Sequence, residues 1–176
     1  MRLFVALDPP AEVRAELATW ADATAPTEVR RVPAENLHVT LAFLGSRGDD
    51  EAGAVARALA TCARRLGPLR TAGALWLPRR RPGVLSVALQ ADDGLSSLQS
   101  GLVAALRHAI AFEPEARPFR PHITVGRVAR GTRIDTRREL LAPPQLSFVP
   151  PAMTLYRSHS VRGGARYEPL ARVDTS

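Results

Sequence analysis

Apolar runs that end at proline or glycine alternate along the chain with longer stretches in which apolar residues recur every three or four positions. The short runs are typical of β-strands, and the periodic stretches are typical of helices. Strands are predicted at residues 3–7, 37–44, 69–77, 84–90, within 118–128, 146–158 and 166–173, and residues 30–33 are expected to be extended. Helices are predicted at residues 12–21, 49–66 and 92–110, with a short helix at 137–141.

The order of these elements limits the fold class. Helices alternate with strands, but strands 69–77 and 84–90 are joined by a short basic turn, which is typical of a hairpin. This combination favours an α+β or mixed-sheet architecture over a doubly wound parallel sheet. No segment has the composition of a linker, so residues 1–176 are expected to form a single domain.

Two of the predicted strands carry a weak internal repeat. Leu37-His38-Val39-Thr40-Leu41 resembles Pro121-His122-Ile123-Thr124-Val125, and the second copy begins 84 residues after the first. Successive side chains of a strand point to opposite faces, so each histidine shares a face with the threonine two residues later. The repeat therefore predicts two similar halves that share one site.

Two imidazoles and two hydroxyls in one cleft suit in-line phosphoryl chemistry. A neutral histidine can take a proton from water that attacks phosphorus, and a protonated one can give a proton to the departing oxygen. Threonine hydroxyls can donate to the non-bridging phosphate oxygens. A single H-x-T is more often a structural histidine, but two copies in two strands favour catalysis by His38 and His122.

The charge balance fits a phosphate-bearing partner. The chain carries 24 basic and 17 acidic residues, a formal charge of +7, and every basic residue is arginine. Arginine suits phosphate recognition, although a genome rich in arginine codons would give the same excess. The single cysteine, Cys62, excludes an internal disulfide and is expected in the core.

Other classes of function lack their motifs. The histidines are scattered and have no metal-ligand spacing, so no metal is expected. There is no P-loop or dinucleotide fingerprint, which disfavours an ATP-dependent ligase, and no cofactor is expected. No apolar run approaches the roughly 20 residues of a membrane helix, so a cytoplasmic protein without membrane contact is expected.

The motifs in combination resemble the 2H phosphoesterases, and in particular the bacterial RNA 2′,3′-cyclic phosphodiesterases once called 2′-5′ RNA ligases. The resemblance runs nearly end to end. It rests on residues 2–6, on the first motif at 32–45, on the second motif at 117–127, and on the tail at 155–158, 163–165 and 167–170. It implies two pseudo-symmetric lobes around a central cleft, each an antiparallel or mixed sheet with helices outside.

The resemblance also implies roles for individual residues. His38 is the expected proton donor to the leaving 3′ oxygen and His122 the acceptor from water, with Thr40 and Thr124 holding the phosphate. The product is then a 2′-phosphomonoester. The sequence without the resemblance leaves the two histidine roles interchangeable. The expected partner is an RNA with a 2′,3′-cyclic phosphate end, such as a tRNA fragment or a small nucleotide, and the expected state is a monomer.

Several further residues are candidates for substrate contacts. Arg127 is expected to contact phosphate, although strict alternation from His122 points it away unless the strand contains a bulge. Tyr156 is a candidate for the cleft, whereas Phe43 is expected in the core. Arg81, in the basic run 79–81, and Arg120, beside Arg117, are candidates for contacts with RNA, with a solvated surface as the alternative. Trp20 and Trp76 are expected in the core, and His108 is expected to be structural or exposed.

The chain departs from the family at two places that bear on substrate fit. Ser86 stands where a tryptophan is frequent, and His159 stands where an acidic residue is frequent. Two alternatives to RNA hydrolysis remain open at this point. One is a phosphodiesterase of small cyclic nucleotides or 2′-5′ oligonucleotides, and the other is a non-catalytic RNA-binding module. Joining of ends through a 2′-5′ bond is the reverse of the hydrolytic reaction.

Overall fold

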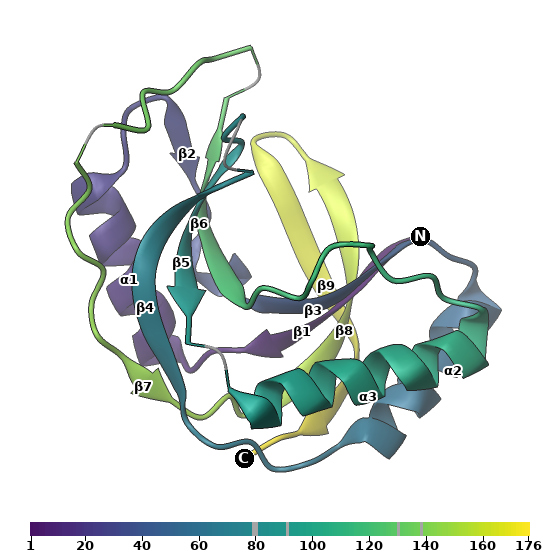
Figure 1. Cartoon of the computed structure of the whole chain (residues 1–176). Helices are drawn as coiled ribbons and strands as arrows, with labels where there is room; N and C mark the ends of the chain where they lie inside the picture. Colours follow the sequence, from purple (N-terminus) through teal and green to yellow (C-terminus); the bar gives the residue numbers. More distant parts are fainter. Residues whose placement is uncertain (79–80, 91, 130, 138) are drawn as a thin grey trace.

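The computed structural model describes residues 1–78, 81–90, 92–129, 131–137 and 139–176. Its strands are β1 (Arg2–Asp8), β2 (Val29–Arg31), β3 (Val39–Ser46), β4 (Leu69–Leu77), β5 (Val84–Leu89), β6 (His122–Val128), β7 (Ser147–Phe148), β8 (Ala152–Val161) and β9 (Gly164–Asp174). Its helices are α1 (Ala11–Thr24), α2 (Asp49–Cys62) and α3 (Asp93–Ile110), with a 3-10 turn η1 (Ala34–Asn36). The strands pair in the order β7-β4-β5-β6-β3-β1-β8-β9, with β2 on β6, and every pairing is antiparallel (Figure 1). The predicted α+β class is confirmed.

Two predicted elements differ from the structure. The helix predicted at 137–141 is wrong for the described residues of that segment, which lie in a turn and an irregular stretch. The strand predicted at 146–158 is interrupted at residues 149–151, where Pro150 and Pro151 lie between β7 and β8. A proline cannot donate a hydrogen bond to a ladder, which explains the break. The predicted hairpin of β4 and β5 is confirmed.

The helices cover the sheet in two places, one covered by α1 and the other by α2 and α3. α1 follows β1 along the chain but contacts β2 and β6, whereas α2 and α3 pack together and contact β3, β8 and β9 (Figure 1). Leu95, Leu98, Leu102, Leu106 and Ile110 form the buried stripe of α3, as the sequence spacing predicts. The N-cap Asp92 accepts a hydrogen bond from the Leu95 amide and so fixes the start of this helix.

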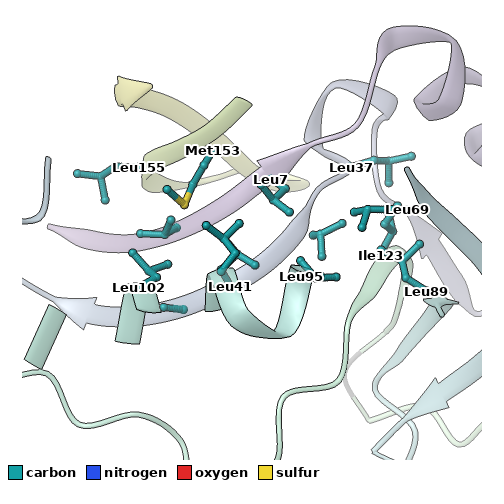
Figure 2. Close-up of a cluster of buried hydrophobic side chains, with 14 of the residues drawn as sticks. Leu7, Leu37, Leu41, Leu69, Leu89, Leu95, Leu102, Ile123, Met153 and Leu155 are labelled. Carbon is teal, nitrogen blue, oxygen red and sulfur yellow. The ribbon is translucent and has the colours of Figure 1, made fainter. Parts of the chain in front are cut away.

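The buried side chains form one continuous core. Leu7, Leu41 and Met153 come from β1, β3 and β8, and Leu89 and Ile123 come from β5 and β6, yet they belong to a single cluster (Figure 2). One half of the sheet consists of β3, β1, β8 and β9, and the other of β7, β4, β5, β6 and β2. The β1 strand lies inside the first half, and all its residues from Leu3 to Asp8 are buried. This core holds the two halves of the sheet against each other.

The two halves meet at β3 and β6, where the only register pair among the described residues joins Val39 to Ile123. The hairpin of β8 and β9 makes a second connection from the end of the sheet. Arg30 of β2 donates to the carbonyl of Gly163 at the tip of this hairpin, and the Asn36 amide donates to the Ala165 carbonyl at 2.9 Å. The junction of the halves is therefore bounded by the hairpin tip.

Candidate active site

The single pair between β3 and β6 brings the two H-x-T motifs together. Because the strands run antiparallel with Val39 opposite Ile123, His38 lies opposite Thr124 and Thr40 lies opposite His122. Val39 and Ile123 point into the core and are fully buried, so the four polar side chains share the other face. Each histidine thus faces the threonine of the other motif.

The two imidazoles are held in the same way. His38 Nδ1 lies 2.7 Å from the Asn36 carbonyl oxygen, and His122 Nδ1 lies 2.7 Å from the Arg120 carbonyl oxygen. A carbonyl only accepts, so Nδ1 carries the proton and donates in both residues. The neutral rings then present an unprotonated Nε2, and a protonated ring presents an Nε2–H donor.

A bulge in β6 places Arg127 on the face of the motif. Thr124 pairs with Ser86 and Gly126 with Leu85, so Val125 is an extra residue in β6. The face of the strand changes at this point, and Gly126 turns to the core. Arg127 is paired with Val84, which shares the face of Ser86, and its side chain lies on the same side as Thr124.

A matching bulge in β3 makes the prediction for Phe43 wrong. Thr40 pairs with Ala6 and Ala42 with Val5, so Leu41 is the extra residue, as Val125 is in β6. Strict alternation would bury Phe43 with Val39, but the bulge turns it to the motif face, where it is 60% exposed. Phe43 therefore occupies in β3 the position that Arg127 occupies in β6.

An aromatic cluster surrounds one of the histidines. The Phe4 ring centroid lies 4.9 Å from that of His38, 5.3 Å from Tyr156 in a stacked arrangement, and 4.9 Å from Tyr167. Tyr167 also contacts His38 edge-on at 5.3 Å, and Phe43 lies 6.3 Å from Phe4. Sequence reasoning missed Phe4 and Tyr167 as site residues, since only the pairing of β1, β8 and β9 brings them to the motif.

The environment of His38 disfavours its charged form. Burial lowers the pKa of the His38 imidazole to about 4, and the nearby Arg127 and Arg14 guanidinium groups act in the same direction. The hydrogen bond to the Asn36 carbonyl and the Asp8 carboxylate oppose this shift in pKa. Arg127 of one half of the sheet thus influences the histidine of the other half.

Two further polar side chains lie beside the motifs on the neighbouring strands β5 and β1. The Ser86 hydroxyl is fully buried and lies 3.3 Å from the Thr124 hydroxyl. Asp8 is 3% exposed and accepts hydrogen bonds of 2.7 Å from the Thr154 and Tyr156 hydroxyls.

Arg30, a third residue that sequence reasoning missed, lies directly opposite Arg127 in the pairing of β2 and β6. Two like charges at such a position favour an anion between them.

Comparison with known proteins identifies the family. Residues 9–162 match the family model described as the 2′-5′ RNA ligase superfamily. The chain belongs to this superfamily. It is 35% identical to the RNA 2′,3′-cyclic phosphodiesterase of Escherichia coli, over 97% of this chain and 94% of that protein. It is 33% identical to the enzyme of the same name from Thermus thermophilus, over 72% of this chain and 68% of that protein. The predicted family and enzyme class are confirmed.

Solved structures of the superfamily agree with the fold. A Thermus thermophilus protein superimposes with a TM-score of 0.83 at 29% identity, covering 99% of this chain and 97% of that one. E. coli LigT in complex with 3′-AMP gives a TM-score of 0.80 at 32% identity, covering 99% and 98%. The predicted α+β fold of this superfamily is confirmed by these neighbours.

The remaining residues predicted for the superfamily site lie in different places. Tyr156 is half-buried beside Phe4, and its hydroxyl donates a hydrogen bond to Asp8. Burial, and to a lesser extent this hydrogen bond, raise the pKa of Tyr156 to about 12. The Arg120 side chain is exposed and its carbonyl holds His122, whereas Arg81 is exposed near the start of β5. Arg79 and Arg80 lie outside the described residues. The roles of Tyr156, Arg120 and Arg81 in substrate binding stay predictions.

Other predictions concern residues away from the motifs. His159 lies 2.6 Å from Glu168 across the β8–β9 hairpin, and His108 is exposed on α3. Trp20 is buried and donates to the Leu141 carbonyl at 3.0 Å, while Trp76 and Cys62 are partly buried against the core. Within the described ranges, no three His, Cys, Asp or Glu side chains group closely enough to hold a metal ion. No helix among the same residues has the length and apolar character to span a membrane.

Proposed function

We propose that the chain hydrolyses RNA 2′,3′-cyclic phosphate ends to 2′-phosphomonoesters without a metal ion. The observation that carries this proposal is the antiparallel pair of Val39 and Ile123, which sets the His and Thr of each motif across from those of the other. The activity is also the one named for the E. coli and Thermus thermophilus relatives. The substrate class is the one for which this group of side chains is chemically suited.

The proposed reaction is an in-line displacement at phosphorus. Water attacks the phosphorus atom and gives its proton to Nε2 of His122, while the bond from phosphorus to O3′ breaks. Protonated His38 gives its Nε2 proton to O3′, so one water is consumed and the 2′-phosphate and 3′-hydroxyl are formed. The hydrogen bonds of both Nδ1 atoms to carbonyl oxygens keep both Nε2 atoms available for these transfers.

Donors around the phosphate supply the charge stabilisation. The Thr40 and Thr124 hydroxyls are placed to donate to non-bridging oxygens, and the Ser86 hydroxyl contacts that of Thr124. Arg127 and Arg30 lie opposite each other and provide fixed positive charge beside the site. Such preorganised donors stabilise charge that develops in the transition state. Because both motifs come from one chain, we further propose that the enzyme acts as a monomer.

The test is turnover of an oligoribonucleotide with a 2′,3′-cyclic phosphate end in excess EDTA, with identification of the product isomer. We expect a 2′-phosphate product from the wild type and a loss of roughly 10²–10⁴-fold in His38→Ala and in His122→Ala. His108→Ala, which changes an exposed histidine of α3, is the matched control and should keep full activity. Full activity of either motif variant, or activity that EDTA abolishes, would contradict the proposal.

A second candidate substrate class is small nucleotides. Solved structures of E. coli LigT contain 3′-AMP, NADP⁺ and ATP, so that protein accommodates mononucleotides and dinucleotides. The same motifs would serve a nucleoside 2′,3′-cyclic phosphate. The ratio of kcat/KM for an oligonucleotide to kcat/KM for the mononucleotide decides between them, and equal values would favour the small-nucleotide function. The reverse reaction, joining ends through a 2′-5′ bond, would use the same residues and no nucleotide cofactor.

A further inference from the structure

The two motifs are nearly equivalent, but the residues next to their histidines on the neighbouring strands differ. In the sheet, β5 lies beside β6 as β1 lies beside β3, and Ala88 is paired with His122. The pairing of Leu7 with Val39, extended by one residue, puts Asp8 at the corresponding position opposite His38. One histidine thus faces a carboxylate across the strands and the other faces a methyl group.

The structure of β1 and β8 keeps the Asp8 side chain in place. Its two oxygens accept one hydrogen bond each from the Thr154 and Tyr156 hydroxyls, and Arg14 of α1 lies 4.0 Å from one of them. These two hydrogen bonds and the nearby cation hold the Asp8 carboxylate in one position. The Phe4 ring is stacked on Tyr156, which donates to Asp8, and it also contacts the His38 ring in a tilted arrangement.

The charged and titratable groups that face His38 come from five elements. Asp8 of β1 favours the protonated ring, while Arg14 of α1 and Arg127 of β6 oppose it. Tyr167 of β9 contacts the His38 ring edge-on, and Tyr156 of β8 lies one ring further away, stacked on Phe4. Without a ligand, burial and the two cations outweigh the Asp8 carboxylate, and the pKa of His38 is low. A phosphate anion on Arg127 would neutralise the cation with the larger effect on the pKa of His38 and add a negative charge beside the ring.

We propose that Asp8 is a positioning residue that makes His38, and not His122, the histidine that takes up a proton when an anionic phosphate binds. The fixed carboxylate of Asp8 stabilises the imidazolium from the neighbouring strand β1, while the phosphate bound at Arg127 stabilises it from the side of β6. The asymmetry of Asp8 and Ala88 then assigns the acid to His38. This consequence for catalysis rests on the function proposed above, whereas the proton uptake itself is a property of the protein and a phosphate ion.

The test is a ¹H–¹³C NMR titration of the histidine ring signals with and without saturating inorganic phosphate. The chain has four histidines, and His38→Gln and His122→Gln identify the two signals of interest. In the wild type, phosphate should raise the pKa of His38 by about one pH unit or more, and by more than it raises the pKa of His122. In Asp8→Asn, which is isosteric, the pKa of phosphate-bound His38 should fall by about one pH unit relative to wild type, and His122 should be unaffected.

Two further variants separate this role from a merely structural one. Thr154→Val removes one of the two donors to Asp8 and should lower the pKa of bound His38 by a smaller amount than Asp8→Asn does. Asp135→Asn removes an exposed carboxylate that bonds only to Arg137 in its loop, and it is the matched control that should shift neither histidine. Comparable shifts in both control and Asp8 variants would overturn the proposal.

Kinetics supply a readout that a loss of folding would not mimic. Asp8→Asn should lower kcat for the cyclic phosphate about tenfold with little change in KM, and it should move the basic limb of the pH profile to lower pH. A substrate in which sulfur replaces the 3′ bridging oxygen has a leaving group that needs no proton. It should restore Asp8→Asn and His38→Ala toward the wild-type rate, but not His122→Ala.

The outcomes for this inference and for the proposed function are distinguishable. A wild type that shows the NMR shifts but no turnover would overturn the function and leave the proton uptake intact. A wild type that turns over the cyclic phosphate, with the His38 pKa unmoved by phosphate or by Asp8→Asn, would overturn the role of Asp8 alone. Greater sulfur rescue of His122→Ala than of His38→Ala would reverse the assignment of the acid.

Discussion

At the scale of single residues, the two motif strands differ most at one equivalent position. The residue that follows each bulge by two places is Phe43 in β3 and Arg127 in β6, and both lie on the motif face. On this face, one motif strand thus presents an aromatic ring and the other a guanidinium. A nucleotide has a base and a phosphate that suit these two groups, and we propose that the pair sets the direction in which the substrate binds.

The charge at Arg127 should contribute strongly to the reaction. Arg127→Ala is expected to lower kcat/KM for a cyclic phosphate about 100-fold, since an arginine–phosphate contact is charge-assisted and bidentate. Arg127→Lys should recover only part of this loss because it keeps the charge without the planar fork. Steady-state kinetics are the measurement, and Arg133→Ala, an exposed arginine away from the motifs, is the control. Equal activity of Arg127→Ala and Arg133→Ala would contradict this role.

The exposed ring of Phe43 should bind a base rather than stabilise the fold. Phe43→Ala is expected to raise KM for a dinucleotide cyclic phosphate about tenfold, because stacking of a base on an aromatic ring is worth about 1–3 kcal/mol. Its Tm should stay within a few degrees of wild type. Leu141→Ala, another exposed apolar residue at 59%, should change neither quantity. A large loss of Tm with an unchanged KM would show that Phe43 is structural.

The lowered pKa of His38 predicts a dependence of stability on pH. The folded-state pKa is about 4 and the unfolded value is about 6.5, so between these values the unfolded chain binds more protons. The contribution of His38 is therefore fully present above about pH 6.5 and is lost as the pH falls toward 4, by at most ~1.4 kcal/mol per pH unit. Urea denaturation at several pH values should show a weaker dependence in His38→Gln. An unchanged slope in that variant would exclude a depressed pKa.

At the scale of elements, the bulges at Leu41 and Val125 determine which side chains reach the site. Each lies directly after an H-x-T, and each changes the face of the strand for the residues that follow. In β6 the change turns Gly126 toward β2, where the backbone packs against Val29. The bulge that delivers Arg127 to the cleft therefore depends on the absence of a side chain at the preceding residue.

A methyl group at position 126 should destabilise the protein. A Cβ added to Gly126 would overlap the buried Val29 side chain, and such overpacking costs about 1–3 kcal/mol. Gly126→Ala should lower the midpoint of urea unfolding and reduce activity through Arg127. Gly73→Ala in β4 is the matched control, because a Cβ there meets nothing within 4 Å. If both alanines cost the same, the packing of β2 on β6 is not the cause.

At the scale of the whole molecule, the continuous core implies that the halves of the sheet depend on each other. Helix α1 contacts β2 and β6, whereas α2 and α3 contact β3, β8 and β9. Strands β1, β3, β8 and β9 of one half are separated along the chain by β2 and β4 to β7 of the other half. We therefore propose that residues 1–176 are a single domain of two intertwined lobes.

A single domain should unfold in one cooperative step. Trp20 of α1 and Trp76 of β4 report on one half of the sheet, while α2 and α3 of the other half supply most of the helical circular dichroism. The urea curves from tryptophan fluorescence and from circular dichroism are expected to coincide. Curves with separate midpoints would instead indicate two domains that unfold independently.

The sequence alone determined the order and kind of most elements, because hydrophobic periodicity reports directly on which face of a strand or helix is buried. It also predicted His38, Thr40, His122 and Thr124 as the residues of one shared site, since a repeated pair of polar residues on apolar strands has few structural explanations. The errors fell where local signals are weak or tertiary packing decides. The helix predicted at 137–141 lacked a long periodic pattern, and Phe43 was assigned to the core by an alternation that a bulge interrupts.

Only the tertiary structure decided how the site is completed. Strand register is a long-range property, so the sequence does not show that Leu7, next to Asp8, pairs with Val39, next to His38, or that Phe4 and Tyr167 flank the His38 ring. A bulge adds one residue to one strand and is visible only when its partner strand is known. The repeat in the sequence makes the two halves alike, and it is the pairing of β1 with β3 and of β5 with β6 that makes their histidines different.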